Sequence, residues 1–175
     1  VRRDEARRLI RDKRPGEARQ ALAAWMAENP TDSEARLLDA FALLHLRDGA
    51  AAAEQASRVL DREPWSVEAC LIMGFVAREQ GDRAEAGRWF KQAVYARHDC
   101  WVAQYYLGEA HRAAGAVDQA RRAYKVALLH LEASPDPDGG LALPLGLPVR
   151  EVRFLCERHA EARDVAPAAP WVGKG

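Results

Sequence analysis

Residues 65–132 read WSVEACLIMGFVAREQGDRAEAGRWFKQAVYARHDCWVAQYYLGEAHRAAGAVDQARRAYKVALLHLE. Small and apolar residues of the first half return 34 positions later: Cys70, Met73, Gly74, Ala77, Gly81, Ala86, Phe90 and Ala93 correspond to Gln104, Leu107, Gly108, His111, Gly115, Ala120, Tyr124 and Ala127. A period of this length indicates a repeated supersecondary unit whose apolar face is buried only when neighbouring units stack.

The same period extends toward the N-terminus. Alanine recurs every 34 residues, at Ala18, Ala52, Ala86 and Ala120. A small side chain lets two helices approach closely, so these alanines mark where the second helix of a hairpin crosses the first. Pro30 and Pro64 keep the same spacing and predict helix ends, because proline interrupts a helix. Four helical hairpins are therefore expected in phase.

This pattern resembles the tetratricopeptide repeat family, with Leu107-Gly108, a turn at Gly115 and a second helix carrying Ala120 and Tyr124. The resemblance implies an all-α fold, a right-handed superhelical solenoid of antiparallel helix pairs with a C-terminal capping helix. The expected organisation is a partial first repeat or linker helix (1–32), repeats over 33–66, 67–100 and 101–134, a loop (135–146), a capping helix (147–164) and a flexible tail (165–175).

The second repeat departs most from the pattern. Ala40 stands where the later repeats have glycine, and Asp39 stands where an apolar residue is expected, so we expect its first helix to be rotated or shifted. Asp48-Gly49 predicts a turn two residues later than the turns of the following repeats. In the first hairpin, Pro15-Gly16 predicts the turn.

Composition excludes several classes of function. Lys and Arg number 26, as do Asp and Glu, so no general attraction to nucleic acid or an anionic membrane is expected. No apolar run is long enough to span a bilayer, and no signal peptide follows the Arg-rich start. The start at Val1 suggests a piece of a larger protein. Cys70, Cys100 and Cys156 lack paired metal-site spacing and are expected to be free thiols in a reducing, cytoplasmic setting, the first and last of them in the core.

Catalytic motifs are missing from the sequence. It contains no phosphate-binding loop, nucleophile elbow or zinc-protease motif. Its histidines are scattered over different hairpins, and we expect His111 to be a packed core imidazole, because the repeat pattern places an aromatic residue there. No catalytic residue, metal or cofactor is therefore assigned to this chain.

The expected binding surface is the inner wall of the curve, which the family pattern assigns to the first helix of each hairpin. The predicted protein-binding groove consists of Leu37, Phe41, His45, Leu71, Phe75, Arg78, Glu79, Tyr105, Glu109 and Arg112. Arg3 and Arg7 fall at equivalent positions of the partial first unit. They form a candidate basic patch for an acidic partner, or else belong to a solvated helix.

An apolar stripe on a concave surface requires a cover. One occupant is an amphipathic helix or extended segment of a protein partner. The other is the chain itself, through its final helix or through Leu141, Leu143, Leu145 and Leu147 of the leucine-bearing loop. The sequence leaves both open.

A narrower resemblance covers Lys91–Leu131, the following Pro/Gly-rich loop, and Gly146-Leu147 with the helix expected over Val149–His159. These segments resemble the C-terminal extension of CheR-type chemoreceptor glutamate methyltransferases, and the Arg- and Ala-rich composition fits a bacterial source such as the gliding-motility homologue. The resemblance implies a regulatory domain whose catalytic part precedes Val1. A monomer is expected, because no second apolar face is evident in the sequence. Its partner would be a chemoreceptor, a coupling protein or that catalytic domain. The alternative is a scaffold or adaptor in a secretion or envelope assembly.

Overall fold

The computed structural model describes residues 2–161, and the regular structure of this range is entirely helical. Its helices are α1 (Arg2–Arg11), α2 (Pro15–Glu28), α3 (Ser33–His45), α4 (Gly49–Leu60), α5 (Val67–Glu79), α6 (Arg83–Ala96), α7 (Trp101–Ala113), α8 (Val117–Ala133) and α9 (Val149–Glu161). Beyond residue 161 lie the end predicted for the capping helix and the whole predicted tail, outside the described residues.

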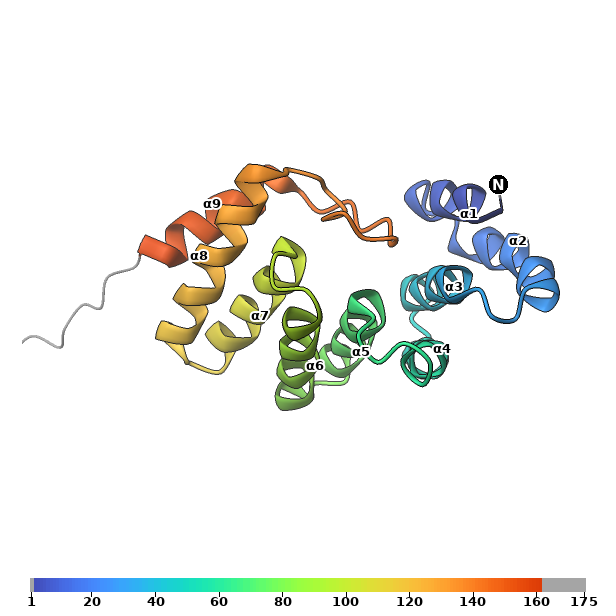
Figure 1. Cartoon of the computed structure of the whole chain (residues 1–175), viewed down its shortest axis with the longest axis horizontal. Coiled ribbons are helices and arrows are strands. Elements are labelled where there is room, and N and C mark those ends of the chain that lie inside the picture. Colours follow the sequence, from blue (N-terminus) through green and yellow to red (C-terminus); the bar gives the residue numbers. More distant parts are fainter. Residues whose placement is uncertain (1, 162–175) are drawn as a thin grey trace, which may run out of the picture.

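The helices form pairs that stack in sequence order, α1 with α2, α3 with α4, α5 with α6, and α7 with α8. Each pair packs on the next, and α9 packs on α8 at the end of the stack. Figure 1 shows the curved array and the segment between α8 and α9, which extends across its inner side toward α1. The prediction of stacked antiparallel helix pairs is confirmed.

The two helices of a pair cross closely. Where α5 crosses α6 and where α7 crosses α8, a small residue on the first helix faces a larger side chain on the second helix. A Cβ atom on Gly74 of α5 would lie 2.4 Å from Cε1 of Phe90 on α6. A Cβ atom on Gly108 of α7 would lie 2.8 Å from Cε1 of Tyr124 on α8. Glycine is therefore required wherever the second helix carries an aromatic ring.

The turns inside the first two pairs contradict two predictions. Each turn between the two helices of a pair contains one residue of positive φ, and these residues keep the 34-residue period: Lys13 (61°), Arg47 (65°), Gly81 (79°) and Gly115 (74°). The predicted displacement at Asp48-Gly49 was wrong, because Arg47 adopts the left-handed conformation that glycine adopts in later turns. The predicted turn at Pro15-Gly16 was also wrong, because these residues begin α2.

The turns stay in register because the same hydrogen bonds close them. The Asp48 N–H donates to the carbonyl of Leu43 at 3.0 Å, and the Asp82 N–H donates to that of Ala77 at 2.9 Å. These bonds satisfy carbonyls that a helix end leaves without partners. Asp48 then caps α4, where its side chain accepts a hydrogen bond from the Ala51 N–H.

Helix α3 is not shifted as expected. It begins at Ser33, and α5 begins 34 residues later at Val67. Asp39 is only 1% exposed, and its Oδ1 accepts a hydrogen bond from Nε of Arg19 on α2 at 2.8 Å. One carboxylate oxygen therefore has a partner on the preceding pair, whereas Oδ2 is buried and has no hydrogen bond among the described residues.

The three cysteines are buried free thiols, which confirms the prediction for Cys70 and Cys156. Burial raises the pKa of the Cys70 thiol to about 11 and that of Cys156 to about 12. His111 is half-buried, so its assignment to the core was wrong. None of the described helices is long and apolar enough to cross a membrane.

Candidate functional site

The predicted apolar stripe lies under a cover formed by the chain itself. The predicted stripe consists of Leu37, Phe41, Leu71, Phe75 and Tyr105. The first four are at most 7% exposed, and Tyr105 is half-buried. Leu141 and Leu143, which lie between α8 and α9, are 9% and 0% exposed and belong to the same buried cluster. We call residues 134–148 the inner loop. Self-coverage, one of the two alternatives left open by the sequence, is thus present in the structure.

The inner loop runs out from α8 and turns back toward α9. Asp136 supports its outgoing segment, accepting hydrogen bonds from the N–H groups of Asp138 at 3.0 Å and Gly140 at 2.9 Å. The Leu147 N–H donates to the Pro137 carbonyl at 3.0 Å, which brings the returning segment of the loop beside the outgoing segment. Gly139 has φ of 63°, and a Cβ there would lie 2.4 Å from Cγ2 of Val102 on α7.

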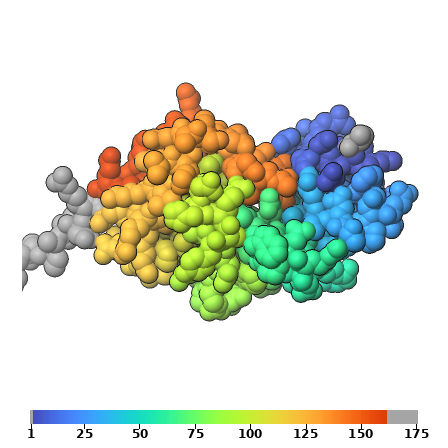
Figure 2. Space-filling view, in the orientation of Figure 1, coloured from blue at the N-terminus to red at the C-terminus, as the bar shows by residue number. Residues whose placement is uncertain are grey.

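Ala142 is held by groups from two distant helices. Its N–H donates to Oε1 of Glu68 on α5 at 3.1 Å, and its carbonyl accepts from Nε of Arg7 on α1 at 3.1 Å. Arg11 of α1 also pairs with Asp138 at 2.9 Å. In Figure 2 the orange atoms of this region meet the blue atoms of the first hairpin. The inner loop therefore connects the C-terminal part of the array to α1.

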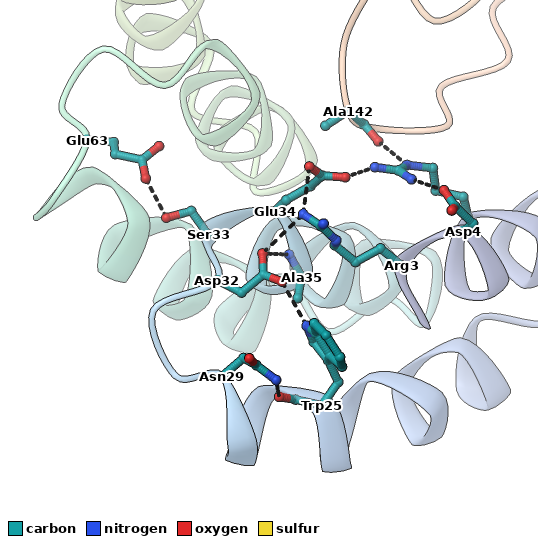
Figure 3. A network of polar contacts seen from close by, with 11 residues as sticks. Arg3, Asp4, Trp25, Asn29, Asp32, Ser33, Glu34, Ala35, Glu63 and Ala142 are labelled. Carbon is teal, nitrogen blue, oxygen red and sulfur yellow. Dashed lines mark hydrogen bonds and ion pairs between the residues drawn. The ribbon is translucent and has the colours of Figure 1, made fainter. Parts of the chain in front are cut away.

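The candidate basic patch is neutralised within the chain. Arg3 Nη1 lies 3.1 Å from Oε2 of Glu34 and 3.7 Å from Oδ1 of Asp32, and Arg7 forms an ion pair with Oε1 of Glu34. Figure 3 shows how Arg3, Glu34 and Asp32 converge close to Ala142. The carboxylates thus compete with any acidic partner for these arginines.

An open cleft of about 300 Å³ lies beside the inner loop. The residues lining this cleft, which we call the aromatic cleft, are Phe41, Leu44, His45, Arg47, Phe75, Arg78, Glu79, Tyr106, Leu145 and Leu147. The predicted groove residues Phe41, His45, Phe75, Arg78 and Glu79 are therefore brought together at one place, between α3, α5, α7 and the returning segment of the loop.

Arg78 differs from the other charged residues of the aromatic cleft because its guanidinium lies against two aromatic rings. Its Cζ lies 5.4 Å from the ring centroid of Phe75 and 5.3 Å from that of Tyr106, and the two rings are 4.8 Å apart. The neighbouring Glu79 pairs with Arg47 at 3.1 Å. No ion pair among the described residues includes Arg78, so its guanidinium is stacked but has no anion.

Of the other predicted groove residues, Leu37 and Leu71 are buried, whereas Tyr105, Glu109 and Arg112 lie toward the C-terminal end. Glu109 and Arg112 line a second cavity together with Arg78 and Tyr106 of the aromatic cleft. Arg112 donates to Oε2 of Glu109 at 3.0 Å and to the Tyr124 hydroxyl at 3.2 Å, and that hydroxyl donates to Oε1 of Glu109. Burial raises the pKa of Tyr105 to about 12, and the ring of His159 on α9 stacks on Tyr124 at 5.3 Å. This cluster joins α7, α8 and α9.

Tyr106 and Arg47 of the aromatic cleft were not among the predicted groove residues. Tyr106 follows Ile72 and Leu38 at intervals of 34 residues, both fully buried, so its position indicated a core residue. The sequence contained one signal that Tyr106 reaches beyond the core. A tyrosine side chain is longer than the aliphatic side chains at the equivalent positions, and it carries a polar hydroxyl. Arg47 was missed because the turn was expected at Asp48-Gly49.

The described residues offer surfaces suited to binding. No group of three or more His, Cys, Asp or Glu side chains that could hold a metal ion occurs among them. The aromatic cleft combines ring faces, leucines and one unneutralised guanidinium. Groups of this kind are suited to contact with apolar and anionic side chains.

No protein-family model matches the sequence, and no curated protein matches it. Solved structures are similar in fold. "MamA 41-end from Desulfovibrio magneticus RS-1" is 21% identical, with 90% of this chain and 88% of that chain covered and a TM-score of 0.61. TTC0263, described as a thermophilic TPR protein in Thermus thermophilus, is 19% identical, with 90% and 89% covered and a TM-score of 0.65.

A third similar structure is that of Naa15/Naa10 bound to HypK-THB. It is 16% identical, and 90% of this chain aligns with 24% of that chain at a TM-score of 0.64. Identities this low establish the fold alone. The predicted TPR solenoid is confirmed by these similarities and by the helical stack.

Proposed function

We propose that this TPR-type solenoid is a protein-binding module and that its partner enters the aromatic cleft. The observation that carries this proposal is Arg78, whose guanidinium lies against Phe75 and Tyr106 without a carboxylate partner among the described residues. A charged group held on aromatic faces at an open cleft is a typical anchor of a protein interface.

The chemistry of the cleft defines the segment that fits it. Phe41, Leu145 and Leu147 offer apolar contact to one large side chain, and Arg78 offers hydrogen bonds to a neighbouring carboxylate. The cleft is therefore suited to a helix or extended peptide with an apolar residue close to an acidic one. The TPR-fold similarities support a protein partner in general.

The more specific proposal rests on the resemblance of residues 91–131 and 146–159 described above. The proposed role is that of a regulatory domain in a CheR-type, S-adenosylmethionine-dependent chemoreceptor methyltransferase. In this role the domain would bind a chemoreceptor, a coupling protein or its own catalytic domain, and would change which glutamates are methylated. Chemistry would reside in the catalytic domain.

Titration with the chemoreceptor, the coupling protein and the catalytic domain tests both the general proposal of a protein-binding cleft and the specific proposal of a chemotaxis role. We expect one of them to bind the wild-type chain and to lose about tenfold or more in affinity to Arg78→Glu, a change of at least about 1.4 kcal/mol. Arg88→Glu is the control, because Arg88 lies exposed on α6 beside Glu85, away from the cleft. Equal affinity for the wild type and Arg78→Glu would contradict the cleft assignment. Failure of all three candidates to bind would contradict the chemotaxis assignment.

A further inference from the structure

We infer that residues 141–143, the tip of the inner loop, occupy the groove as an intramolecular ligand. The partner carries a loop of the same chemistry, which competes with the tip for this binding site, here called the seat. The partner's loop must have two leucine-sized side chains separated by one residue, and the peptide groups of that middle residue must be accessible. This inference rests on the proposed function, because it assigns the partner of the same concave face.

The first support is the contrast between the tip and the rest of the loop. Leu141 and Leu143 are buried, whereas Pro135, Pro137, Gly140 and Gly146 are exposed. Surface loops seldom bury large apolar side chains unless they pack on a receptor surface. The groove thus already shows which side chains it accepts and at what spacing.

The second support is the recognition of the main chain at Ala142. Glu68 accepts its N–H and Arg7 donates to its carbonyl, each at 3.1 Å. Because both contacts are made to backbone atoms, they do not depend on the side chain at this position. A loop from another protein with the same spacing of apolar residues would receive the same two hydrogen bonds.

The third support is that the seat adjoins the aromatic cleft and can be vacated without unfolding a helix. Leu145 and Leu147, on the returning segment, line the cleft directly. Besides the contacts at Ala142, Arg11 pairs with Asp138 and Arg97 donates to the Gly139 carbonyl, and these two arginine side chains are 54% and 40% accessible. Both ends of the loop are anchored in α8 and α9, so a competing loop displaces only residues 134–148.

The competition has a measurable signature. A ligand of an occupied site binds with an affinity reduced by the fraction of molecules in which the site is free. A peptide with the sequence of residues 134–148 should therefore bind weakly to the wild type and more tightly once the resident loop is weakened or replaced.

Fluorescence anisotropy with a labelled peptide of residues 134–148 provides the test. The receptor is the chain in which residues 139–146 are replaced by a Gly/Ser linker, with circular dichroism as the check of folding. We expect saturable binding, at least about tenfold tighter than to the wild type. The peptide carrying Leu141→Asp and Leu143→Asp should not bind. Arg7→Ala in the receptor should weaken binding of the unmodified peptide.

A second receptor is the full chain carrying Leu141→Ala and Leu143→Ala, which keeps the loop and weakens its hold. It too should bind the peptide more tightly than the wild type, and it decides the matter if the linker variant does not fold. Absence of peptide binding to a folded receptor of either kind overturns the inference. Light scattering that shows loop-exchanged dimers of the wild type would also overturn it, because a second copy would then be the occupant.

These outcomes are separable from those of the proposed function. Partner binding that responds to Arg78→Glu, together with a peptide that binds neither receptor, would leave the protein-binding function standing and would remove the resident ligand. The reverse result would locate recognition at the loop seat instead of the aromatic cleft.

Discussion

At the scale of single residues, the pairs of helices are matched by complementary side-chain size at their crossings. Phe90 and Tyr124 lie on the second helices opposite Gly74 and Gly108. The corresponding residues of the second pair are Ala40 and Ala56, and both are fully buried. A loss of volume on α4 thus accompanies a gain on α3. This explains why Ala40 does not disturb the stack.

Gly74→Ala tests this matching. The new Cβ would lie within 3.0 Å of three atoms of the Phe90 ring, so the ring or the helix must move. We expect a loss of about 1–3 kcal/mol in the free energy of unfolding, as for other overpacked cores, measured by urea denaturation.

Gly87→Ala is the matched control for that substitution. Gly87 also lies within a helix, and the nearest atom to its new Cβ is the Ala110 Cβ at 3.9 Å. Here the higher helix propensity of alanine should dominate and stabilise the protein by up to about 1 kcal/mol. If both variants lost stability equally, close packing at Gly74 would not explain its cost.

Residue patterns also show where reading the sequence succeeds and fails. The recurrence of small residues was sufficient to predict the stack, because close approach excludes larger side chains. The turn at Arg47 was misassigned, because arginine seldom adopts positive φ and only the period, through Gly81 and Gly115, indicates that it does so here. Tyr106 was not predicted as a groove residue, because its counterparts at the 34-residue period, Leu38 and Ile72, are aliphatic.

At the scale of elements, the first helices of the pairs start in different ways. Asp32 caps α3 and Ser66 caps α5 through side-chain hydrogen bonds to the N–H groups of Ala35 and Ala69. Asp32 does more, because its Oδ2 also accepts from Nε1 of Trp25 on α2 at 2.7 Å. This carboxylate therefore joins the first pair to the second, as Figure 3 shows.

Asp32→Ala should cost more than the loss of an ordinary cap. Removing an N-cap costs about 0.5–2 kcal/mol, and we expect the upper end of this range because the Trp25 contact is lost too. Asp82→Ala is the comparison, because Asp82 is exposed and caps α6 through Glu85 N alone. Chemical denaturation at neutral pH measures both, and an equal cost would show that the Trp25 contact contributes nothing.

The same carboxylate gives a pH dependence. Burial raises the pKa of Asp32, but hydrogen bonds from Trp25 and Ala35 and the charge of Arg3 outweigh it, so the pKa lies below its ordinary value of 3.8. The stabilisation is thus complete above the ordinary value and is lost as the pH falls through the lower folded-state pKa. The stability difference between the wild type and Asp32→Ala should therefore shrink below about pH 4.

Elements differ in how well the sequence predicts them. The helices and the inner loop were expected because periodicity and the Pro- and Gly-rich composition are local signals. The seat of the loop was left open, because it depends on contacts between residues far apart in the chain, such as Arg7 with Ala142. No local pattern encodes such a pairing. The distribution of the predicted groove residues over the core, the aromatic cleft and the cluster beside α9 has the same origin.

At the scale of the whole molecule, the inner loop gives the solenoid a connection that a simple repeat array lacks. In such an array each unit contacts only its neighbours, so stability is a sum of local terms. Here Arg7 and Arg11 of the first helix bind the segment that follows the last repeat. Local unfolding of the first helix pair should therefore also destabilise the inner loop.

Leu22→Ala tests this coupling. Leu22 is fully buried on α2, and its truncation should cost about 2–5 kcal/mol. Hydrogen exchange should accelerate in α1 and α2 and also at the Ala142 and Gly146 amides of the loop, while the amides of α6 stay protected. In an Arg7→Ala/Arg11→Ala background the same substitution should no longer affect the loop, because the connection to α1 is cut. Unchanged loop exchange in Leu22→Ala itself would mean that the array unfolds unit by unit despite the loop.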